Sequence, residues 1–136
     1  MKFKLIVCSV IVLLIVGLTV FGFEVWKILQ YEKRGLETRT VCMSLVRFVE
    51  NEKRWPSSWD ELSLPAEKLD VYKSSVDIRF DLTLSEASEL FMNGQPVVKP
   101  KFRSLPSFES AVQELERVVI EAVQEQDNDA EIETAD

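Results

Sequence analysis

Carboxylates are the side chains of this sequence best suited to chemistry, because the chain contains no histidine. Without histidine there are no Ser–His or Cys–His nucleophile pairs, no imidazole metal ligands and no general base that titrates near neutral pH. A catalytic pair of carboxyls has to be held a few ångströms apart in a cleft. A carboxylate enzyme would therefore require the acids most suitably placed in the sequence to converge in one pocket. These are Asp60, Glu61, Asp77 and Asp81.

The strongest pair among them is Asp77 and Asp81, which lie on the same side of an alternating segment with Arg79 between them. Positions i and i+4 of a strand are about 13 Å apart, which is too far for an acid–base pair. We interpret both as solvated charges. The sequence therefore predicts a protein that is not an enzyme, with no catalytic or cofactor-binding residue, no cofactor and no small-molecule substrate.

The two cysteines do not suggest a site either. Cys8 and Cys42 are 34 residues apart, which is about 50 Å if the connecting chain is helical. A disulfide requires a Cα separation of roughly 4.4–6.8 Å. We expect Cys42 to be a small buried apolar residue, with an interchain disulfide in an oxidising compartment as the alternative. One soluble thiol cannot build a zinc site, and Ile132 stands where a calcium loop starting at Asp127 would require glycine. No metal is expected.

The element that must position everything else is an uncharged run of nineteen residues, from Leu5 to Phe23. As a helix it is about 28 Å long, close to the roughly 30 Å of bilayer hydrocarbon. A cleaved signal usually has a shorter apolar region followed by small residues. We therefore favour a retained signal anchor, while cleavage after Gly22 stays open as the alternative.

Orientation rests on the basic residues at the two ends of this run. Lys2 and Lys4 precede it, and a similar number of basic residues follows within about 16 positions, so the positive-inside count is nearly tied. A short basic head is the usual form of a signal anchor. We expect a single pass through the cell (inner) membrane, with the N-terminus cytoplasmic and the bulk extracytoplasmic.

Charge is distributed unevenly along the chain. The net charge is −7, and residues 121–136 contain seven acids and no base, so residues 1–120 are neutral with sixteen of each sign. No basic patch or stripe is present, which argues against nucleic-acid binding. We expect residues 125–136 to form an acidic disordered tail.

The segment after the apolar run has the periodicity of helices. The apolar positions that recur at helical spacing before Asn51 are Val41, Cys42, Leu45, Phe48 and Val49. They predict that one long helix leaves the membrane, with a weak point at Gly35, and turns one face to a core. A second amphipathic helix is expected after a Ser107 cap, with its apolar face running from Phe108 to Val123.

Between these helices the sequence predicts short elements. Ser58 followed by Glu61 has the spacing of a capping box and predicts a short helix there. Residues 76–84 alternate with period two and predict a half-buried strand. Residues 85–94 could form a short helix, which we favour, or the first arm of a hairpin. Pro96 and Pro100 restrict residues 97–102 to an edge strand or an extended segment.

This layout resembles the type IV pilin and pseudopilin group. The resemblance lies in the long N-terminal helix and in the aromatic–proline segment Asn51-Glu52-Lys53-Arg54-Trp55-Pro56-Ser57-Ser58-Trp59-Asp60-Glu61-Leu62 that follows it. It implies a small antiparallel sheet after this segment and assembly into filaments through the apolar half of the helix. The prepilin cleavage motif does not precede Leu5.

Together these features predict an α+β protein with a long N-terminal helix, transmembrane then amphipathic, a small antiparallel sheet, a C-terminal amphipathic helix and the acidic tail. The expected parts are a basic head (1–4), an anchor (5–23), a helical stem with a small domain (24–124) and the tail (125–136). We expect a non-catalytic structural or interaction protein of the cell envelope. Its partners would be the lipid bilayer and a protein or second copy bound through the N-terminal helix. The alternative is a pilin-like subunit, and a carboxylate enzyme is the third possibility.

Overall fold

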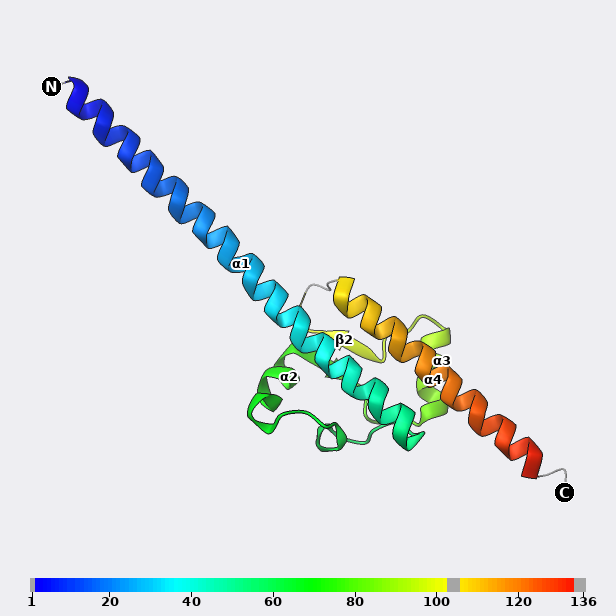
Figure 1. Cartoon of the computed structure of the whole chain (residues 1–136). Coiled ribbons are helices and arrows are strands. Elements are labelled where there is room, and N and C mark those ends of the chain that lie inside the picture. The colour runs from blue at the N-terminus through cyan, green and yellow to red at the C-terminus, as the bar shows by residue number, and fades with distance from the viewer. Residues whose placement is uncertain (1, 103–105, 134–136) are drawn as a thin grey trace. The chain divides into compact units, whose positions relative to one another are not determined.

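The computed structural model describes the backbone of residues 2–102 and 106–133 (Figure 1). In chain order the elements are α1 (Lys2–Glu52), η1 (Trp59–Glu61), η2 (Ala66–Lys68), α2 (Leu69–Ser75), β1 (Val76–Ile78), α3 (Leu84–Met92), β2 (Val98–Pro100) and α4 (Pro106–Glu133). Contacts divide the chain into two units, Met1–Arg34 and Gly35–Asp136. The expected α+β class, with a long N-terminal helix and a small antiparallel sheet, is confirmed.

The first unit is helical throughout its described part. α1 is long and apolar enough by composition to cross a membrane, and it is the one helix of that kind among the described residues. Its large apolar side chains from Ile11 to Phe23 are all exposed. A helix in which such residues cover the whole circumference has no polar face to turn to water.

The second unit is built around one apolar core. The stripe expected on α1 is confirmed, because Cys42, Leu45 and Val49 are fully buried and Phe48 packs against the same cluster. α4 contributes its predicted face to this cluster, from Phe108 to Ala122. α3 also packs against α4 (Figure 1). The helical periodicity of both segments therefore reflects a shared core, as the sequence indicated.

α1 ends in the aromatic–proline segment. Lys53 adopts a left-handed φ of 50° and its N–H donates to the carbonyl of Val49 at 3.0 Å, which closes the helix. Trp55 is then buried, and its indole Nε1–H donates to the carbonyl of Arg79 at 2.7 Å. This bond fastens the end of α1 to the chain just after β1.

The short helix expected after Ser58 is present as η1, but the predicted capping box is wrong. The Ser58 side chain makes no capping hydrogen bond. The Glu61 carboxylate accepts instead from Arg54 and from the backbone N–H of Ser57. The Arg54 guanidinium supplies two charge-assisted hydrogen bonds and the N–H of Ser57 a third, so the carboxylate is bonded to residues that precede Ser58.

The strand expected over residues 76–84 is much shorter. β1 pairs antiparallel with β2 in the register Val76↔Pro100, Asp77↔Lys99 and Ile78↔Val98, and ends there. Thr83 caps α3 in a complete capping box: its hydroxyl accepts from the N–H of Glu86, and the Glu86 carboxylate accepts from the N–H of Thr83. Residues that continue the alternation are therefore drawn into a turn and a helix.

α3 confirms the helical interpretation of residues 85–94 over the hairpin. Two backbone hydrogen bonds close its C-terminal end: the N–H of Gly94 donates to the carbonyl of Phe91, and the N–H of Gln95 donates to the carbonyl of Leu90. Gly94 itself has a φ of +65°. A left-handed residue at this position favours glycine. The chain then enters β2, so the expected extended segment between Pro96 and Phe102 is confirmed in part as a strand.

α4 differs from expectation at both ends. It begins at Pro106, which suits a first helical position, so Ser107 lies inside the first turn and is not the cap. It continues to Glu133, whereas the sequence predicted a disordered tail from residue 125; residues 134–136 lie outside the described part. Lys53 contacts the beginning of this extension: its ammonium pairs with Glu125 at 2.5 Å and its carbonyl accepts from the side chain of Gln126 at 2.6 Å.

Candidate functional site

The carboxylates considered for catalysis are engaged in surface contacts or exposed. Asp77 is exposed in the middle of β1, and Asp81 pairs with Arg79 at 3.6 Å with both side chains exposed. Asp60 is exposed in η1. Searched over the described residues, the structure places no three acidic, cysteine or histidine side chains where they could hold a metal ion.

Glu61 has the most specific surroundings of the four. Its two oxygens accept from the Arg54 guanidinium at 3.0 and 3.1 Å, and Oε2 also accepts from the N–H of Ser57 at 2.6 Å. The bonds from Arg54, and then that from Ser57, lower the pKa of Glu61 to about 2. A general acid or base works best with a pKa near the operating pH. This carboxylate therefore stays ionised and fixes the loop after α1.

Cys42 is buried at 0% exposure on the core face of α1. Burial removes water from the thiolate and raises the pKa of Cys42 to about 12. A reactive cysteine requires the opposite, a stabilised and accessible thiolate. The expectation that Cys42 is a small buried apolar residue is confirmed. The side chain of Cys8 lies outside the described residues.

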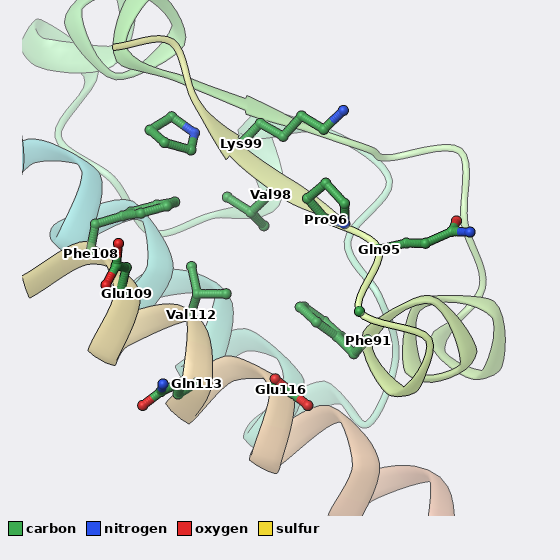
Figure 2. A pocket seen from close by; sticks show the side chains of 12 residues that line it. Phe91, Gln95, Pro96, Val98, Lys99, Phe108, Glu109, Val112, Gln113 and Glu116 are labelled. Carbon is green, nitrogen blue, oxygen red and sulfur yellow. The ribbon is translucent and has the colours of Figure 1, made fainter. Parts of the chain in front are cut away.

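A groove of about 430 Å³ lies between β2 and α4 (Figure 2). Its walls are mainly apolar, with Phe91 from α3, Val98 from β2, and Phe108 and Val112 from α4. Lys99 and Glu116 lie at opposite rims. The groove can therefore accept an apolar side chain or segment. The sequence did not reveal it, because its walls come from three separated segments.

The free edge of β2 limits how that groove can be used. On either side of β1, the Val97 carbonyl accepts from the N–H of Arg79 and the N–H of Lys101 donates to the carbonyl of Ser75. The alternating positions 96, 98 and 100 therefore direct their backbone groups away from β1. Two of these three positions are proline, which has no N–H to donate. An incoming strand would find one donor, at Val98, so the edge is protected against extension of the sheet.

The other candidate surface is the apolar helix of the first unit. Its large apolar side chains between Ile11 and Phe23 are 49–70% exposed. Such a continuous apolar surface marks a membrane or protein interaction site. Comparison of the chain with models of known families, with curated proteins and with solved structures finds no match.

Proposed function

We propose that this chain is a single-pass, membrane-anchored structural or interaction protein of the cell envelope, without catalytic activity. The observation that carries the proposal is the exposed apolar surface of α1 between Ile11 and Phe23. Removing each of these side chains from water is favourable by roughly 1.5–3 kcal/mol of transfer free energy. Lipid can cover all sides of an isolated helix, whereas a single protein partner covers one.

The proposed location is the cell (inner) membrane, with the N-terminus in the cytoplasm and the domain outside. The basic pair Lys2 and Lys4 supports this orientation. Neither Glu61, which Arg54 holds as a carboxylate, nor the Cys42 thiol, which is buried in the core, is poised for catalysis, and this is compatible with a role in binding. These groups stabilise a domain whose surface is available to partners.

Membrane anchoring is tested on the full chain by extraction at alkaline pH. Wild-type protein should stay with the lipid, whereas Leu14→Arg combined with Leu18→Arg should release it, because each arginine costs about 2.5–3.5 kcal/mol at the centre of a span. Met92→Arg is the matched control, since Met92 is equally exposed but lies in α3 of the second unit. Release of the wild type, or retention of the double variant, would contradict the anchor.

The proposed partner is a protein or a second copy bound through the N-terminal helix. Replacing residues 5–23 by a leucine–alanine helix of the same length should keep the anchor but remove sequence-specific contacts. Crosslinking in membranes should then lose the adducts that the wild-type chain forms. Identical adducts in both proteins would place the partner contact on the second unit instead.

A further inference from the structure

The boundary between lipid and water can be drawn at two places on α1. The uncharged run ends at Phe23, but exposed apolar residues continue as Val25, Ile28 and Leu29, interrupted by Glu24 and Lys27. Moving the boundary from Phe23 to Leu29 shifts it by about 9 Å along the helix. The contacts made by the side chains in this stretch decide between the two positions.

Four side chains form a connected cluster on one turn of α1, which we name the interfacial turn (Phe23, Glu24, Trp26 and Lys27). The rings of Phe23 and Trp26 stack with centroids 6.3 Å apart and planes 21° from parallel. The Lys27 ammonium lies 4.5 Å from the centre of the Phe23 ring and 3.1 Å from a carboxylate oxygen of Glu24. Phe23, Glu24 and Trp26 are exposed and Lys27 is half-buried, so the cluster is formed while most of its outer surface stays open to solvent or lipid.

We propose that the interfacial turn is a binding site for zwitterionic phospholipid headgroups and fixes the hydrocarbon boundary at Phe23. The inference rests on the proposed membrane anchor. With the boundary at Leu29, Glu24 would lie about 7.5 Å inside the hydrocarbon, where an ionised carboxylate is strongly disfavoured. With the boundary at Phe23, the Phe23 ring meets acyl chains and the Trp26 ring lies at headgroup level, where indoles concentrate.

The charges of the interfacial turn match such a headgroup. Lys27 carries three N–H donors, and the pair with Glu24 uses one of them, so the others can bind a lipid phosphate. The Glu24 carboxylate can bind the ammonium group of the same or a neighbouring lipid. Because the Glu24 carboxylate lies beside the Lys27 ammonium, the turn has no net charge. Its electrostatic attraction to an anionic lipid surface is therefore weak.

The depth of Trp26 tests the boundary. The full chain is placed in phosphatidylcholine vesicles that contain lipids brominated either near the headgroup or deep in the acyl chain. The contribution of Trp26 to fluorescence is the difference between wild type and Trp26→Phe, which removes the background of Trp55 and Trp59. Quenching of this difference should be stronger with shallow than with deep bromine. Stronger quenching by deep bromine, or none by either, would overturn the proposal.

The charges are tested by Lys27→Gln and Glu24→Gln in the same vesicles. Lys27→Gln combined with Glu24→Gln removes both charges and should let Trp26 sink, so that shallow and deep quenching become equal; an unchanged quenching ratio would overturn the boundary at Phe23. Adding phosphatidylglycerol should leave the wild type unchanged but alter quenching in Glu24→Gln, whose turn carries a net positive charge. An equal response of both proteins to the anionic lipid would overturn the match to zwitterionic headgroups. Loss of the protein from the vesicles at alkaline pH would instead count against the anchor itself.

Discussion

Trp55→Phe should destabilise the second unit more than Trp59→Phe, the same change at a half-buried tryptophan. The indole of Trp55 is 5% exposed and donates to the carbonyl of Arg79 at 2.7 Å. Phenylalanine leaves this carbonyl without its donor, which costs about 1–3 kcal/mol. The smaller ring also gives up roughly 40 Å² of buried apolar surface, about 1 kcal/mol. The expected loss is therefore about 2–4 kcal/mol, out of a total of about 5–15 for a small domain.

Urea unfolding of the full chain in detergent, followed by circular dichroism, measures this loss with the same signal in every variant. Trp59→Phe is the matched control, because Trp59 is half-buried and meets Phe80 edge to face at 5.6 Å, a contact that a phenyl ring retains. Its loss should stay below about 1 kcal/mol. A Trp55→Phe variant as stable as wild type, or less affected than Trp59→Phe, would refute the fastening of α1 to the chain after β1.

Three further predictions concern the second unit. In a Cys8→Ser variant, Cys42 should resist labelling by maleimide at pH 8 until urea unfolds the domain, because burial raises the pKa of its thiol to about 12. Labelling at the rate of a free thiol would contradict the packing of Cys42 in the core. Thr83→Ala removes the cap of α3 and should lower the free energy of unfolding, measured in urea, by about 1 kcal/mol. Ser58→Ala removes no capping hydrogen bond and should change it little. Equal losses of stability in the two variants would count against the capping assignment. Glu61 has a pKa lowered from 4.5 to about 2, so its contribution is present above pH 4.5 and is lost as the pH falls toward 2. The difference in urea midpoint between wild type and Glu61→Gln should shrink over that interval, and a constant difference would be inconsistent with the contact to Arg54.

The helical parts of the fold were predictable because their periodicity records burial on one face. Cys42, Leu45 and Val49 face the core of the second unit, as their spacing indicated. The glycine after α3 marked its end for a local reason, since Gly94 supplies the left-handed φ. Both signals are contained in a few neighbouring residues, so no distant partner is needed to interpret them.

The strand and the contacts of Glu61 could not be predicted in the same way. The alternation over residues 76–84 is broken because Thr83 finds a better local partner in Glu86. The partner strand β2 is equally short and spans only Val98–Pro100. The spacing of Ser58 and Glu61 predicted a cap, but the bend that follows α1 at Lys53 and Arg54 brings Arg54 to the carboxylate instead.

The groove between β2 and α4 shows a further limit. Phe91, Val98 and Val112 are apolar positions in three separate segments, and only Val112 lies on a face that the sequence predicted to be apolar. That they leave a space of about 430 Å³ between them depends on how α3 and α4 are spaced. Spacing of this kind is a property of the packed elements, so no local pattern in the sequence records it.

The intact mass of protein extracted from membranes tests the central claim most directly, because an anchor must be both inserted and retained. Protein expressed from this sequence should keep all 136 residues in the membrane fraction, at 15.6 kDa. A mass that lacks residues 1–22 would contradict the account, since it would show that the apolar segment is a cleaved signal. Loss of a short basic leader would instead favour the pilin-like alternative.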